Sequence, residues 1–334
     1  MQARQPQQRP ETLPLPKEQL MEFYTHMLLI RRFEEMAAQM YARGRIGGFL
    51  HLYIGEEAVA VGSIAALETQ DYIVTHYREH GHALARSMDP NRIMAELFGK
   101  ATGTSGGKGG SMHLFDASRS FLGGYAIVGG MMPIATGLGL ASSYLGEDRI
   151  TLCYFGDGAV NQGEFHEALN LAAIWNLPVL FFLENNGYGM GTRVDRVCAV
   201  DEIHTHANIY GIPSRKIDGM DVLTVYEATK EAVEQVRSGK GPFFLEALTY
   251  RFRGHSMADP VEYRQRAEEE QWKARDPIDA FRTKLEGWGV LTEQEREAVE
   301  GRVDDIVDEA VRFAEDSPTP PPEALAQHLY AEKE

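Results

Sequence analysis

Two almost continuously apolar runs constrain the fold of this 334-residue chain more than any other feature. They are residues 150–155 and 179–183, and a helix-like stretch at residues 164–175 separates them. A strand that is apolar on both sides must be covered on both sides, which is typical of parallel sheets flanked by helices. The pattern predicts an α/β fold with a mainly parallel sheet and helices on both faces.

Other segments extend this alternation of strands and helices. The further helical segments are residues 19–42, 56–67, 132–145 and 222–236, and the further strands are residues 72–74 and 243–248. Near the end, Thr292 and Glu295 have the spacing of a capping box at the start of a helix, which the proline-rich residues 317–322 end. We predict a flexible tail at residues 1–16 and one domain at residues 17–334 with a helical C-terminal extension.

Charge and cysteine content exclude several classes of protein. Lys and Arg number 33 against 49 Asp and Glu, a net charge of −16, which disfavours nucleic acid or an anionic membrane as a partner. Two cysteines cannot form a disulfide framework or a four-cysteine zinc site. The first residues lack the apolar core of a secretory signal, so we expect a cytoplasmic protein. The uncharged residues 120–146 are rich in glycine and predict a buried loop and helix rather than a membrane span.

Polar motifs follow both apolar strands. Gly156, Asp157 and Gly158 come directly after the first strand, and Asn186 follows the second. Consecutive parallel strands end at the same edge of a sheet, so Asp157 and Asn186 should face one cavity with oxygen ligands suited to Mg²⁺. The glycines would let a diphosphate approach the backbone at the N-terminus of the following helix. Either motif alone is an ordinary turn, but the pair at this spacing matches the signature for thiamine diphosphate.

Several further blocks appear in the order of a known family. They lie at residues 48–58, 76–81, 106–113 and 251–260. From about His51 to Arg264 the chain resembles the alpha subunits of the thiamine-diphosphate-dependent 2-oxo acid dehydrogenase (decarboxylating) component, and it is most similar to pyruvate dehydrogenase (acetyl-transferring). The resemblance implies the thiamine-diphosphate-binding fold, with this chain as the half that holds the diphosphate.

The resemblance also implies roles for individual residues. Asp157 and Asn186 would bind Mg²⁺ through their side chains and Tyr188 through its carbonyl, while His51 and His255 would handle protons near the reacting carbon. The cofactor-binding residues would be Tyr77, Arg78, Ala126, Val128, Asp157, Gly158, Ala159, Asn186, Arg251 and His255. The sequence departs from the family at Ala126, where Gly is usual; a methyl group there is compatible with a contact through the carbonyl.

The activity implied is oxidative decarboxylation of pyruvate, a small 2-oxo acid, with transfer of the acetyl group to lipoyl on an acyltransferase core. The carboxylate that activates the cofactor would come from a beta subunit, which implies a heterotetramer of two alpha and two beta chains. Ser256 lies where related mitochondrial enzymes are phosphorylated, but we do not expect that regulation in a bacterial-looking chain.

Other functions remain open on the sequence. Within the family, the alternatives are acetoin dehydrogenase and branched-chain 2-oxo acid dehydrogenase. Outside it, they are half of a transketolase-like enzyme and a non-catalytic cofactor-binding module. His76, His80 and His82 invite a zinc interpretation, as do His204 and His206, but they lack a His-Glu-x-x-His motif or a cysteine partner.

Overall fold

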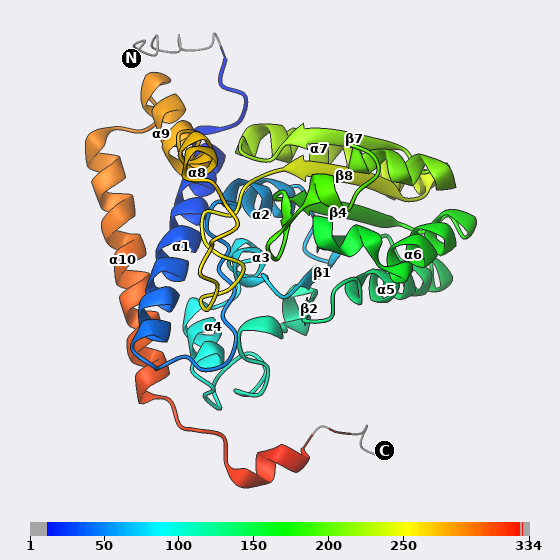
Figure 1. Cartoon of the computed structure of the whole chain (residues 1–334). Helices are drawn as coiled ribbons and strands as arrows, with labels where there is room; N and C mark the ends of the chain where they lie inside the picture. The colour runs from blue at the N-terminus through cyan, green and yellow to red at the C-terminus, as the bar shows by residue number, and fades with distance from the viewer. Residues whose placement is uncertain (1–11, 328, 330–334) are drawn as a thin grey trace.

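The computed structural model describes residues 12–327 and 329, so residues 1–11 of the predicted tail lie outside the described residues. Its centre is a parallel sheet of six strands in the order β2-β1-β3-β4-β8-β7 (Figure 1). The strands are β1 (Tyr72–His76), β2 (Phe121–Tyr125), β3 (Thr151–Gly156), β4 (Val179–Asn185), β7 (Ser214–Asp218) and β8 (Phe243–Leu248). The predicted parallel α/β fold is confirmed.

Helices cover both faces of this sheet. On one face, Leu152 and Tyr154 of β3 join a core with α1 (Lys17–Ala42), α2 (Glu57–Ile64) and α7 (Val222–Gln235). On the other face, Cys153 and Phe155 pack with α5 (Met131–Leu145) and α6 (Gly163–Ile174). Because successive strand residues point to opposite faces, β3 must be apolar throughout, which explains the run that predicted it.

The helical C-terminal extension is also confirmed. It consists of α8 (Arg266–Lys273), α9 (Pro277–Gly287) and α10 (Glu293–Asp316). The capping box forms as predicted, since Glu295 N donates to Thr292 Oγ1 and Thr292 N donates to the Glu295 carboxylate. Helix α10 runs beside α1 and also packs on α4 (Pro90–Leu97) (Figure 1). Its buried side chains are Val299, Val303, Val307, Ala310 and Ala314.

The remaining elements are short. They are helix α3 (His80–Ala85), the hairpin of β5 (Tyr188–Gly189) and β6 (Thr192–Arg193), a π-helical turn at Val236–Lys240, and 3-10 helices at Gly110–Met112, Ala117–Arg119, Asp157–Asn161, Val194–Arg196, Ile203–Tyr210 and Pro322–Ala326. Residues 120–146, which carry no charge, form β2, a loop and α5. No helix in the part of the chain that the structure describes is both long and apolar enough to cross a membrane.

Two strands of the central sheet, β2 and β7, were not predicted, nor was the short hairpin of β5 and β6. Strands β2 and β7 form the two edges of the central sheet. Strand β7 has the sequence Ser-Arg-Lys-Ile-Asp, in which only Ile217 is buried. Charged side chains are common on edge strands, where they discourage pairing with another chain, and they hide the apolar pattern that identifies a strand. Strand β2 contains Gly123 and Gly124, which also weaken the strand signal.

Gly124 makes room for a buried carboxyl group at the start of α3. A Cβ atom at residue 124 would lie 2.1 Å from the carboxyl carbon of Glu79. Glu79 Oε1 accepts a hydrogen bond of 2.8 Å from the Leu114 amide, whereas Oε2 is buried without a partner among the described residues. Burial raises the pKa of Glu79 from 4.5 to about 8. Between these two values the folded protein holds a proton that the unfolded chain has lost, so the contribution of Glu79 to stability falls as the pH rises.

We therefore expect Glu79→Gln, which mimics the protonated side chain, to stabilise the protein at pH 8 and to change little at pH 5. The melting temperature at pH 8 should rise by roughly 2–4 °C, the shift that ~1 kcal/mol gives in a large domain. Thermal unfolding of both proteins at the two pH values tests this. An equal shift at both would show that the side chain is ionised in the folded protein.

Candidate active site

Most of the predicted residues gather at the carboxyl ends of the sheet strands. A cavity of about 300 Å³ lies there. The sequence-predicted residues that line it are Tyr77, Arg78, Val128, Asp157, Gly158, Ala159, Asn186, Tyr188 and Arg251. The register explains the meeting, because Gly156 of β3 pairs with Glu184 of β4, and the polar motifs follow these two residues directly.

The loop after β3 provides a close approach to the backbone. Asp157 begins a 3-10 helix and is almost fully buried, and burial raises its pKa to about 6. A Cβ atom at Gly158 would lie 3.3 Å from the Cα of Gly189, which explains why a glycine stands at this wall of the cavity. The carboxylate and the bare backbone thus lie at the same cavity, as the motif predicted.

The turn after β4 fixes the second polar side chain. Asn186 Oδ1 accepts a hydrogen bond of 3.3 Å from the Tyr188 amide. Asn186 Nδ2 donates to Glu56 Oε1 at 3.1 Å. Burial, followed by the charge of Glu184, raises the pKa of Glu56 to about 7. Glu56 was not predicted as a site residue, although it stands in one of the sequence blocks that carried the resemblance.

Two buried guanidinium groups give the cavity positive charge. Arg78 donates to the carbonyls of Leu52 at 2.7 Å and His255 at 2.9 Å. Arg251 donates to the carbonyl of Met190 at 3.1 Å. Burial, followed by the charge of Arg251, lowers the pKa of Arg78, although Glu56 Oε2 lies 3.8 Å from Arg78 Nε and opposes this shift. An anion in the cavity would relieve the repulsion between the two arginines.

His51, Tyr77 and His255 form a cluster of rings beside the cavity. The ring centroids of His51 and Tyr77 are 4.6 Å apart, and those of His51 and His255 are 5.1 Å apart. Burial and the charge of Arg78 lower the pKa of His51 to about 2 and that of His255 to about 4. Both imidazoles are therefore neutral near pH 7. Each has a buried Nδ1 atom without a hydrogen-bond partner in the described part of the chain.

His51, His255 and Ala126 do not line the cavity itself. The two histidines join it through Tyr77, which faces both rings and is a lining residue. Ala126 follows β2 and precedes Ile127 and Val128, whose side chains are 74% and 39% exposed. The strip of residues 126–128 is therefore exposed on this side of the site, where another protein surface could cover it.

The sequence did not predict the network around Glu184. Its carboxylate accepts from Tyr53 and lies 2.5 Å from His76 Nε2 and 3.0 Å from His82 Nε2. His76 Nδ1 accepts from the Arg78 amide at 3.1 Å, so the network supports the segment that carries Tyr77 and Arg78. Glu184 stands immediately before Asn185-Asn186, and this position next to the predicted motif was the sequence signal that could have identified it as a site residue.

The histidine groups that invited a zinc interpretation are occupied by other contacts. His76 and His82 bind Glu184, His80 binds Glu34, and His204 binds Glu246. Across residues 12–327 and 329, no group of three or more His, Cys, Asp and Glu side chains is arranged to hold a metal ion. The proposed Mg²⁺ ligands are one carboxylate, one amide and one carbonyl, a donor set of oxygen atoms that suits a hard cation.

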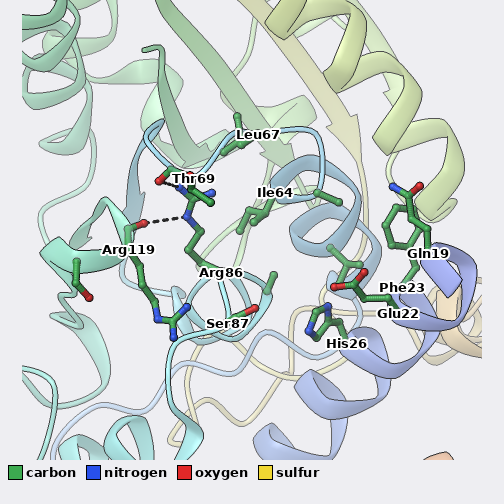
Figure 2. Close-up of a pocket in the computed structure, with 14 residues that line it drawn as sticks. Gln19, Glu22, Phe23, His26, Ile64, Leu67, Thr69, Arg86, Ser87 and Arg119 are labelled. Carbon is green, nitrogen blue, oxygen red and sulfur yellow. Dashed lines mark hydrogen bonds between the residues drawn. The ribbon is translucent and has the colours of Figure 1, made fainter. Parts of the chain in front are cut away.

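A second cavity lies at the opposite edge of the sheet, before the amino ends of β1 and β2. It has about 410 Å³ and contains none of the sequence-predicted residues. Figure 2 shows Arg86 pointing toward the segments before both strands, where it donates to the carbonyls of Thr69 at 2.7 Å and Arg119 at 2.9 Å. Its guanidinium thus joins two loops, and no ligand is needed to satisfy it.

The fold and the cavity together define a class of protein that holds an anionic cofactor at the carboxyl edge of a parallel sheet. Residues 25–323 match the family described as dehydrogenase E1 component, and the chain belongs to this family. It is 49% identical to the pyruvate dehydrogenase E1 component subunit alpha of Rhizobium meliloti over 305 residues, which cover 91% of this chain and 88% of that one. It is 45% identical to the subunit of that name from Porphyra purpurea, with 95% and 94% covered.

The paired guanidinium groups lead to a binding prediction. We expect the protein to bind inorganic diphosphate, and Arg251→Lys to weaken binding by about tenfold or more, since hydrogen bonds to charged groups contribute roughly 1.5–3 kcal/mol. Isothermal titration calorimetry measures the affinity, and Arg266→Lys, on the exposed surface of α8, is the matched control. Equal affinities for the two variants would place the anion elsewhere.

Proposed function

We propose that this chain is the alpha subunit of a pyruvate dehydrogenase E1 component, which decarboxylates pyruvate and passes the acetyl group to lipoyl on an acyltransferase core. The observation that carries this proposal is the cavity in which Asp157, Asn186, Arg78 and Arg251 meet. Membership of the E1 family and the names of relatives such as that of Rhizobium meliloti support it.

The residues fit thiamine diphosphate and Mg²⁺. Asp157, Asn186 and the Tyr188 carbonyl would hold the metal ion. Arg78 and Arg251 would hold the diphosphate, with Tyr77 and the backbone of Gly158 and Ala159. The bare backbone at Gly158 and the lowering of the Arg78 pKa by Arg251 both favour a metal–diphosphate pair at this site.

When bound, thiamine diphosphate supplies the electron sink for loss of carbon dioxide from a 2-oxo acid. The protein's task is to orient the reactants and to manage protons. His51 and His255 are neutral, and each has a buried Nδ1 without a partner among the described residues. In the tautomer that leaves Nδ1 unprotonated, either ring could accept a proton at that atom. The nearby arginines oppose a positive charge on these rings until the anionic cofactor offsets them.

A beta subunit would complete the site. Among the described residues, two carboxylates line the cavity: Asp157 is assigned to the metal, and Glu184 is bound by Tyr53, His76 and His82. Neither is free to activate the aminopyrimidine ring, so the partner would supply that group. The strip of Ala126, Ile127 and Val128 would contact this ring.

The surface of α5 and α6 supports assembly with partner subunits. Exposed large apolar residues gather there, and their side chains are mostly uncovered: Tyr144 is 87%, Leu145 65%, Ile174 65% and Trp175 48% exposed. Exposed large apolar side chains on two helices that contact each other favour an interface in a soluble protein. We assign it to the α2β2 heterotetramer. We also propose a cytoplasmic location, which the bacterial relatives favour.

The decisive activity experiment uses this chain copurified with its native beta partner, thiamine diphosphate and Mg²⁺. We expect substrate-dependent reduction of a dye with pyruvate, and slower reduction with 2-oxobutanoate, branched 2-oxo acids and acetoin. The alpha chain alone should show no turnover. Preference for acetoin or a branched acid would change the substrate but keep the site, whereas turnover of sugar phosphates alone would favour the transketolase-like alternative.

Asp157→Asn tests the metal site. Loss of the anionic oxygen should weaken Mg²⁺-dependent binding of thiamine diphosphate by about tenfold or more, by the same strength of charged contacts. Calorimetric titration of the cofactor at several Mg²⁺ concentrations gives the affinity. Asp148→Asn, on an exposed loop, is the control. Unchanged Mg²⁺ dependence in Asp157→Asn would exclude this residue as a ligand.

A further inference from the structure

Side chains, rather than a neighbouring strand, hold the segment that carries His51. Residues 51–53 have no regular secondary structure. The His51 amide donates to Ser111 Oγ at 3.4 Å, and the Tyr53 amide donates to Glu34 Oε1 at 2.7 Å. Both amides are buried with their residues, so each would lose its only described acceptor if that side chain were removed.

The two acceptors belong to one chain of contacts. The other oxygen of Glu34, on α1, lies 2.9 Å from His80 Nδ1. His80 Nε2, on α3, lies 3.0 Å from Ser111 Oγ. The side chains of Glu34 and His80 are completely buried, and Ser111 is 6% exposed. Three distant parts of the sequence therefore converge behind the His51 segment.

The contacts also fix the protons. His80 Nε2 lies 3.1 Å from the Ser111 carbonyl, which can only accept, so this nitrogen carries a proton. Burial opposes a charge on the imidazole, but the charge and hydrogen bond of Glu34, together with Glu79 and the Ser111 backbone, raise the pKa of His80. Ser111 Oγ accepts from His80 and from the His51 amide. Although the residue types are those of a serine hydrolase triad, His80 has no free nitrogen to deprotonate Ser111, so the serine is an acceptor and not a nucleophile.

We propose that Glu34, His80 and Ser111 form a positioning relay that sets the His51 ring against Tyr77 and His255. This inference rests on the proposed function of His51 at the reacting carbon. None of the three relay residues lines the cofactor cavity, so they act through the backbone of residues 51–53. A catalytic ring displaced by a small distance loses much of its effect, which makes such support functionally important.

Hydrogen–deuterium exchange tests the relay without any turnover. In the full chain copurified with its partner, Ser111→Ala should speed exchange of a peptide covering residues 50–54 by about fivefold, which corresponds to the ~1 kcal/mol that a hydrogen bond contributes. Ser142→Ala is the matched control, because Ser142 is also fully buried but its hydroxyl has no partner among the described residues. Unchanged exchange in Ser111→Ala would overturn the proposal.

A second pair of variants tests the relay independently if Ser111→Ala fails to fold. Glu34→Gln keeps an oxygen for the Tyr53 amide and a polar group for His80, so exchange should stay near the wild-type rate. Glu34→Ala removes both and should exchange faster. Equal rates in the two Glu34 variants would show that the relay does not hold the segment.

Activity measurements distinguish a specific effect on the position of His51 from a general loss of structure at the site. Ser111→Ala should lower kcat with pyruvate by about tenfold while the affinity for inorganic diphosphate stays unchanged, because the relay acts on His51 and not on the arginines. A parallel loss of kcat and diphosphate affinity would contradict a specific effect on His51. If the wild-type complex fails to turn over pyruvate, the proposed function fails, while the exchange experiment still decides whether the relay exists.

Discussion

The parallel direction of β1, β3 and β4 is the constraint on which the site depends. Parallel strands deliver the segments that follow them to one edge, so Tyr77, Asp157 and Asn186 meet although 109 positions separate the first from the last. The side chains on both faces of β3 are buried under helices, and its register with β4 sets Gly156 opposite Glu184. A slip of this register would move the polar segments that follow the two strands relative to each other.

The second constraint is the burial of charged side chains at the cavity, whose charges are only partly neutralised by other residues of this chain. Arg78 and Arg251 repel each other, while burial raises the pKa values of Asp157 and Glu56. An enzyme can accept this cost where a ligand supplies the missing charges, because groups fixed before binding need no reorganisation afterwards. A metal ion would favour ionised carboxylates, and a diphosphate would favour the cations. The site is thus better suited to a ligand that carries both positive and negative charge, such as a metal–diphosphate pair, than to a neutral ligand.

The strand motifs were predictable because each carries a local signal. The apolar runs of β3 and β4 require burial on both faces, and Gly158 lies where two backbones approach closely. By contrast, the network of Glu184 with His76 and His82 joins residues about 100 positions apart through side-chain contacts, for which a single sequence has no periodic pattern. The edge strand β7 was missed for a different reason: its charged residues suit an edge but hide its strand character.

The same distinction explains what one chain can and cannot provide. The part of the site that we propose holds the diphosphate consists of segments that follow neighbouring strands, so a single sheet is enough to build it. The exposed strip at Ile127 and Val128 has no covering element among the described residues, and the apolar surface of α5 and α6 is similarly uncovered. Burying those apolar side chains against a second subunit would stabilise the assembly and close the cavity by the same contact. Assembly and catalytic competence would then be coupled, because one interface excludes water and brings the remaining functional group to the cofactor.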